Sequence, residues 1–132
     1  SIYDGFEKSL KALKAAGKRL FVATSKPEVY ARKIIKHFGL EKYFEYIAGM
    51  ELDGGRGSKA EVIEYLIDTC HVMDKQRILM IGDREHDVLG AKKEGIDCMG
   101  VLYGFGDREE LEKAGAVCLA ETPEDIAEII LK

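Results

Sequence analysis

Short apolar runs alternate with amphipathic helical patterns along the whole chain, and this alternation constrains the fold most strongly. The runs that we expect to form strands are 19–24, 46–49, 78–82, 98–102 and 116–120. The stretches that we expect to form helices are 6–17, 26–39, 59–71, 85–94, 108–114 and 123–131. Strands that alternate with helices form parallel sheets covered by helices on both faces. We therefore predict one doubly wound α/β domain over residues 1–132, a parallel sheet flanked by helices.

The helical stretches also indicate which side chains enter the core. Apolar side chains in residues 59–71 recur every three to four positions. In residues 26–39, Val29, Ile34 and Phe38 fall broadly on one face. We expect both faces to pack against the sheet.

Charge and composition exclude several classes of partner. The net charge is -4 and no cluster of lysine and arginine is dense, so we predict no nucleic-acid partner. No apolar run approaches the roughly 18 residues of a membrane span, and the first residues lack a signal-peptide pattern, so we predict no membrane partner. The cysteines, Cys70, Cys98 and Cys118, are far apart in apolar surroundings, as in reducing compartments. We predict a cytoplasmic protein.

Polar residues follow three of the predicted strands directly. They are the segments TSK at 24–26, GD at 82–83 and YGFGD at 103–107. Ligands of parallel α/β sheets bind beyond the carboxyl ends of the strands, so we expect these segments to border one site. A connecting role remains the simpler expectation for the glycine-rich segment 103–107.

Asp83 and Asp87 lie at the end of a buried strand and in the first turn of the next helix. Both carboxylates can point into the same volume above the sheet. Mg²⁺ commonly takes one or two protein carboxylates and keeps several waters, so the pair is a candidate magnesium site. The ordinary alternative is capping of the helix, where aspartate accepts unpaired backbone amides.

Thr24 and Lys59 complete the candidate site. Thr24 ends a strand beside amides that can bind an anion, although a plain turn role is the alternative. Lys59 stands at a helix start, where its charge opposes the helix dipole, and a bound anion would explain that placement. Solvation at the surface is the alternative for this lysine. Together these groups supply the electrostatic parts of phosphoryl transfer.

The segments FVATSKP, GSKAEVI and ILMIGDREHDVLGAKKEG resemble, in this order, motifs II, III and IV of the haloacid dehalogenase superfamily. The resemblance is closest to its phosphoglycolate-phosphatase-like branch and covers almost the whole chain. It implies that Thr24 binds the substrate phosphoryl group, with Ser25 beside it, and that Lys59 neutralises the nucleophile and the phosphoryl oxygens. It further implies that Asp83 ligates Mg²⁺ directly and that Asp87 does so directly or through a water.

Motif I of that family, a strand that ends in DxD and carries the nucleophilic aspartate, has no counterpart in residues 1–132. The resemblance places this strand, followed by the cap domain, before Ser1. We therefore expect residues 1–132 to be the C-terminal major part of a catalytic core, inactive alone and unable to fold alone in this form.

The resemblance implies a Mg²⁺-dependent phosphomonoester hydrolase that acts on a small phosphorylated metabolite through an aspartyl-phosphate intermediate. A phosphomutase of the β-phosphoglucomutase type is the alternative among enzymes. A non-catalytic phosphate-binding module is the alternative if Ser1 is the true start. Receiver domains match less well because Thr24 and Lys59 precede Asp83 here.

Overall fold

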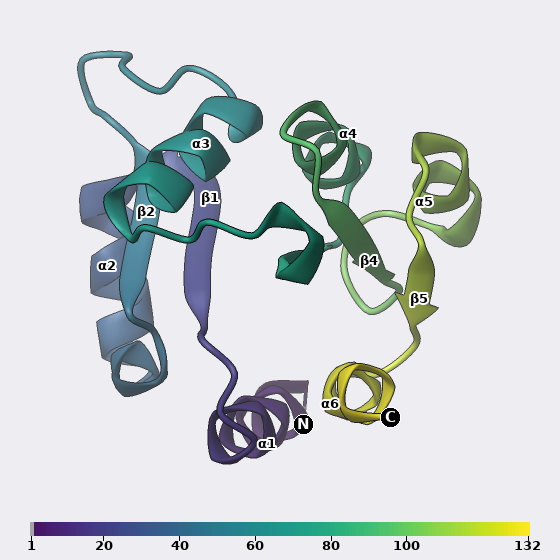
Figure 1. The fold of residues 1–132 in the computed structure, drawn as a ribbon. Coiled ribbons are helices and arrows are strands. Elements are labelled where there is room, and N and C mark those ends of the chain that lie inside the picture. Colours follow the sequence, from purple (N-terminus) through teal and green to yellow (C-terminus); the bar gives the residue numbers. More distant parts are fainter. Residues whose placement is uncertain (1) are drawn as a thin grey trace.

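Strands and helices alternate along the chain as predicted (Figure 1). The computed structural model describes the backbone of residues 2–132 and the side chains of residues 4–132, so Ser1 lies outside the described part. The helices are α1 (Ile2–Ala15), α2 (Glu28–His37), α3 (Lys59–Thr69), α4 (Glu85–Lys93), α5 (Arg108–Ala114) and α6 (Pro123–Leu131). The strands are β1 (Phe21–Pro27), β2 (Tyr46–Met50), β3 (Leu79–Gly82), β4 (Asp97–Val101) and β5 (Cys118–Ala120).

All strand pairs in the described residues are parallel, but they fall into two ladders. β1 pairs with β2, and β3, β4 and β5 pair in that order. No hydrogen-bonded ladder joins β1 to β3 within residues 2–132. Figure 1 accordingly shows β1 and β2 on one side of the molecule and β4 and β5 on the other. The parallel α/β prediction is confirmed.

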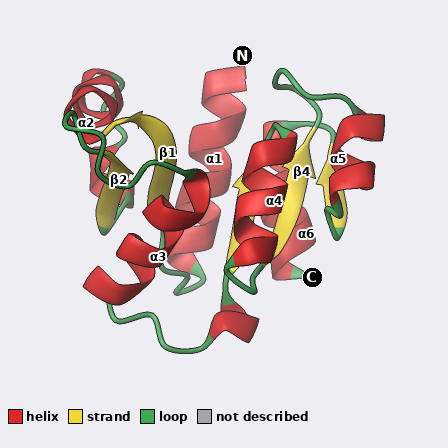
Figure 2. Ribbon diagram, turned by 90° about the horizontal axis from the view of Figure 1, so that it is seen from above, coloured by secondary structure: helices red, strands yellow, loops and turns green. Residues whose placement is uncertain are grey.

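Helices cover both faces of the three-stranded ladder, which is the doubly wound arrangement. α1 and α6 pack together on one face, and α4 and α5 cover the other, with α3 beside α4 over β1 and β2 (Figures 1 and 2). Successive residues of β4 serve the two faces. Met99 packs with Leu13 and Ile126 from α1 and α6, whereas Cys98 packs with residues of α4 and α5. The three-stranded ladder is therefore buried on both sides.

Two expectations about the first half of the chain were wrong. β1 begins later than predicted and extends to Pro27, because its pairing with β2 continues beyond the apolar run to the partners Pro27 and Met50. The face of α2 that carries Val29, Ile34 and Phe38 is exposed. This helix packs instead through Ala31 and Ile35, residues that lie between the predicted apolar positions.

Within residues 2–132, no helix has the length and apolar character needed to cross a membrane.

Candidate functional site

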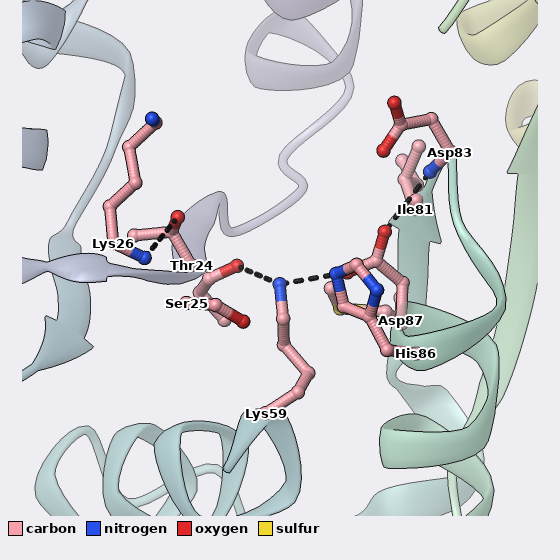
Figure 3. Close-up of a pocket in the computed structure, with 11 residues that line it drawn as sticks. Thr24, Ser25, Lys26, Lys59, Ile81, Asp83, His86 and Asp87 are labelled. Atoms are coloured by element: carbon pink, nitrogen blue, oxygen red, sulfur yellow. Dashed lines mark hydrogen bonds and ion pairs between the residues drawn. The ribbon is translucent and has the colours of Figure 1, made fainter. Parts of the chain in front are cut away.

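The carboxyl ends of β1 and β3 border a pocket of about 360 Å³, with the first turns of α3 and α4 beside it (Figure 3). The pocket is lined by Ala23, Thr24, Ser25, Lys26, Lys59, Met80, Ile81, Gly82, Asp83, His86 and Asp87. All five residues that the sequence singled out as site residues therefore lie around one volume. Two of the three predicted rim segments contribute to its lining.

Lys59 extends from the first position of α3 toward the gap between the two ladders (Figure 3). Its Nζ lies 2.8 Å from Asp87 Oδ1 and donates a hydrogen bond of 3.2 Å to the carbonyl oxygen of Ala23 in β1. The side chain is 10% exposed. Lys59 is thus an enclosed, paired cation rather than a solvated surface lysine.

Asp87 caps the start of α4 and pairs with Lys59 at the same time. Its Oδ2 accepts hydrogen bonds from the amides of Asp83, at 3.1 Å, and Arg84, at 3.3 Å. Its Oδ1 faces Lys59, and the ring nitrogen Nε2 of His86 lies 3.7 Å from the same oxygen. The capping alternative therefore describes Asp87 well, and both carboxylate oxygens already have partners. Gly82 permits this geometry, because a Cβ there would collide with the Asp87 side chain.

Asp83 lies at the other side of the pocket from Lys59, held by the loop that follows β4 (Figure 3). Its Oδ2 accepts from the Phe105 amide at 3.0 Å, and its carbonyl accepts from the Gly106 amide at 2.9 Å. A Cβ on Gly104 would collide with the Asp83 side chain, so the glycine-rich loop is built to admit this carboxylate. Burial, and next the Asp83 charge, raise the pKa of the neighbouring Tyr103 to about 12.

Thr24 and Ser25 form the β1 side of the pocket. The Thr24 hydroxyl oxygen accepts a hydrogen bond of 3.1 Å from the Lys26 amide, a local turn contact that fixes the threonine rotamer. Ser25 is exposed at the pocket edge. The β1 side of the pocket therefore contributes two hydroxyl-bearing side chains to its lining.

Sequence reasoning missed His86 and Gly104. His86 lines the pocket from the first turn of α4, with its side chain 55% exposed. The sequence could have indicated His86, because it lies between Asp83 and Asp87. The fit between Gly104 and Asp83 joins two segments distant in sequence, so no local pattern could have indicated it.

Oxygen ligands for a hard cation come from two carboxylates at most. Asp83 offers the carboxylate with fewer protein partners, whereas Asp87 could contribute through a water because its own oxygens are engaged. No cluster of three or more potential metal-ligating side chains occurs among the residues that the structure describes. The pair fits Mg²⁺, which is commonly held by one or two carboxylates with water or phosphate oxygens completing the shell.

The fold and pocket define a parallel α/β protein whose candidate site joins a lysine, two aspartates and two hydroxyl groups at the strand ends. The model of the haloacid dehalogenase-like hydrolase family matches residues 1–101. The chain belongs to this family, as the sequence motifs predicted.

Curated relatives carry several names. A 5'-nucleotidase of Pseudomonas aeruginosa is 48% identical over 110 residues, which cover 83% of this chain and 49% of the relative. The tyrosine-protein kinase PtkA of Mycobacterium tuberculosis is 41% identical, covering 98% of this chain and 45% of the relative. A phosphoglycolate phosphatase of Colwellia psychrerythraea is 32% identical, covering 86% of this chain and 50% of the relative. The chain thus spans about half the length of the curated relatives it matches.

Solved structures agree with the fold. A predicted phosphatase from Clostridium acetobutylicum superposes with a TM-score of 0.94 at 43% identity, covering 98% of this chain and 59% of that one. The prediction of the superfamily, and of its phosphoglycolate-phosphatase-like branch, is confirmed by these comparisons together.

Proposed function

We propose that this chain is the larger part of the catalytic core of a Mg²⁺-dependent phosphomonoester hydrolase that acts on small phosphorylated metabolites in the cytoplasm. The observation that carries the proposal is the enclosed Lys59 ammonium, placed between the Thr24 strand end and the carboxylates of Asp83 and Asp87. A fixed cation with hydroxyl groups on one side and hard oxygen ligands on the other suits a phosphoryl group.

Each residue then has a distinct task. Thr24 donates its hydroxyl hydrogen to a phosphoryl oxygen, because a phosphoryl oxygen can only accept. The Lys26 amide donates to the Thr24 oxygen and so leaves that hydrogen available. Ser25 adds a second hydroxyl at the pocket edge. Lys59 neutralises negative charge on the phosphoryl oxygens, and its pairing with Asp87 holds the ammonium in place beforehand.

Asp83 would hold Mg²⁺ directly, and Asp87 through a water. The cation supplies charge neutralisation and orientation of the phosphoryl group. The Phe105 amide keeps the Asp83 carboxylate turned to one rotamer, so the ligand needs little reorganisation on binding. In this proposal the nucleophilic aspartate, which forms the aspartyl-phosphate that water cleaves, belongs to sequence outside residues 1–132, as does the cap that selects substrate.

The names of the relatives support phosphomonoester hydrolysis and suggest substrates to test first. The 5'-nucleotidase and phosphoglycolate phosphatase names point to nucleoside 5'-monophosphates and phosphoglycolate. The kinase name points to a different reaction, phosphoryl transfer to protein tyrosine.

The test uses the complete protein with p-nitrophenyl phosphate, a nucleoside 5'-monophosphate and phosphoglycolate. We expect release of inorganic phosphate with Mg²⁺ and loss of that release on chelation with EDTA, recovered by added Mg²⁺. A phosphomutase would isomerise a sugar phosphate without net release. A folded protein that releases no phosphate from any of these esters would contradict the proposal.

A further inference from the structure

The loop between β2 and α3, residues 51–58, contains an arginine in a backbone conformation that arginine seldom adopts. Arg56 has a φ of 57°, in the left-handed region that disfavours residues with a Cβ. Such a conformation costs on the order of 1 kcal/mol or more and persists only where surrounding contacts enforce it. The Arg56 side chain makes such contacts with four neighbouring residues.

The Arg56 guanidinium is almost enclosed, with the side chain 13% exposed. Its Nε donates a hydrogen bond of 2.9 Å to the Gly49 carbonyl at the end of β2. Its two other nitrogens lie 3.5 Å from Glu28 Oε1 and 3.4 Å from Glu51 Oε1. Its Cζ lies 3.9 Å from the ring centroid of Tyr65 in α3. One side chain thus joins β2, α2, α3 and its own loop.

The Arg56 contacts reach the segment that carries Thr24. Glu28 Oε1 also accepts a hydrogen bond of 3.2 Å from the Gly49 amide, so Glu28 and Arg56 together satisfy both backbone groups of Gly49. A Cβ on Gly49 would lie 2.5 Å from the Lys26 carbonyl oxygen and 2.8 Å from the backbone of Glu28. The two strand ends therefore meet closely at this point, two to four residues after Thr24.

The other end of the same loop delivers Lys59. Ser58 is the N-cap of α3, and its Oγ accepts from the Glu61 amide at 3.2 Å. Lys59 is the first residue of α3 and directly follows loop 51–58. The conformation of this loop therefore determines the position of the Lys59 backbone, from which the side chain extends. A Cβ on Gly90 of α4 would lie 2.8 Å from Lys59 Cγ, which shows that the lysine stem passes α4 with little room to shift.

We propose that Arg56 is a positioning residue that fixes Lys59 relative to Thr24, through its bonds to Gly49 and Glu28 on one side and its place in the α3 entry loop on the other. The effect expected on catalysis rests on the proposed function. Arg56 itself is not among the residues that line the pocket.

The chain offers a matched control. Arg32 of α2 also pairs with Glu28, at 3.3 Å, and also lies over a tyrosine ring, that of Tyr46 at 4.9 Å. Arg32 contacts Glu28 and Tyr46, and both of these partners lie outside loop 51–58. Replacing Arg32 therefore removes a similar charge pair without releasing the loop.

The first arm of the experiment measures amide hydrogen exchange in the complete protein. Arg56→Ala should speed exchange at the amides of residues 51–60, while Arg32→Ala should leave them near wild type. This arm does not depend on enzymatic activity, so it tests whether Arg56 holds the loop even if the proposed function fails. Unchanged exchange in residues 51–60 of Arg56→Ala would overturn the inference.

The second arm is a double-mutant cycle on kcat/KM for p-nitrophenyl phosphate. Arg56→Ala should lower kcat/KM on the order of tenfold to a hundredfold, as for a misplaced catalytic group, and Arg32→Ala less than about twofold. In a Lys59→Ala background, the same Arg56→Ala change should cost less than about twofold, because the group that it positions is absent. An equal loss in both backgrounds would show that Arg56 acts on stability in general and would overturn the inference.

Discussion

Lys59 and Asp87 form an ion pair across the gap between the two ladders, with Nζ 2.8 Å from Oδ1 and side chains that are 10% and 7% exposed. Among the described residues, the enclosed Lys59 ammonium has two partners, the Asp87 carboxylate and the Ala23 carbonyl. The pair therefore fixes a positive charge at the ends of both β1 and β3. This relationship determines where an anion could bind.

Replacing Lys59 with Ala should lower kcat on p-nitrophenyl phosphate on the order of a hundredfold or more, because one preorganised electrostatic group is lost. Asp87 keeps its two amide partners in this variant, so circular dichroism should still show a folded protein. The assay compares Lys59→Ala with wild type at saturating Mg²⁺. A loss below about twofold would show that Lys59 has no catalytic role.

Cys98 predicts a dependence of stability on alkaline pH. Burial, and next the Asp87 charge, raise the pKa of this thiol to about 12, from an ordinary value of 9.0. A raised folded-state pKa means that the protonated thiol contributes fully to stability below about pH 9 and that this contribution is lost as pH rises toward about 12. The urea midpoint of wild type should therefore fall more steeply above about pH 9 than that of Cys98→Ala.

Comparison with Cys98→Ala isolates the thiol, because Tyr103 also has a pKa raised to about 12 and titrates in both proteins. Parallel slopes in the two proteins would contradict the prediction.

Residues 1–132 expressed alone should not form a stable fold. The facing edges of β1 and β3 share no ladder in the described residues, and most residues of both strands are half-buried. Backbone groups that leave water without gaining a partner cost on the order of 1 to 3 kcal/mol each. The summed cost of several such groups is comparable to a typical domain stability of roughly 5 to 15 kcal/mol. Amide exchange should show weak protection in β1 and β3. Strong protection in both strands, with a cooperative melt, would show that the sheet closes without a further strand.

The sequence predicted most elements because their apolar periodicity and end signals agree with the packing. The helix bounds 108–114 and 123–131 match α5 and α6, which begin after the N-caps Asp107 and Thr122. α2 was misjudged because periodicity shows that a helix has an apolar face but not which neighbours are available to cover it. Ala31 allows close approach to the sheet, so the larger residues Val29 and Phe38 point outward.

The site was predicted where its residues follow strand ends, since parallel strands bring those ends together. What escaped prediction depends on contacts between distant segments. The fit of Gly104 around Asp83 and the enclosure of Arg56 by Gly49, Glu28 and Tyr65 are set by tertiary packing alone. No local spacing in the sequence encodes them.

Replacing Asp83 with Asn tests most directly whether Asp83 holds the Mg²⁺ of the proposed reaction. Asparagine keeps the shape and can still accept from the Phe105 amide, so the fold should remain intact while the charge is lost. The measurement is Mg²⁺ binding by isothermal titration calorimetry together with hydrolysis of p-nitrophenyl phosphate, in the complete protein. We expect weakened Mg²⁺ binding and loss of turnover in Asp83→Asn. Turnover and Mg²⁺ affinity equal to those of wild type would contradict the assignment of Asp83 as a magnesium ligand.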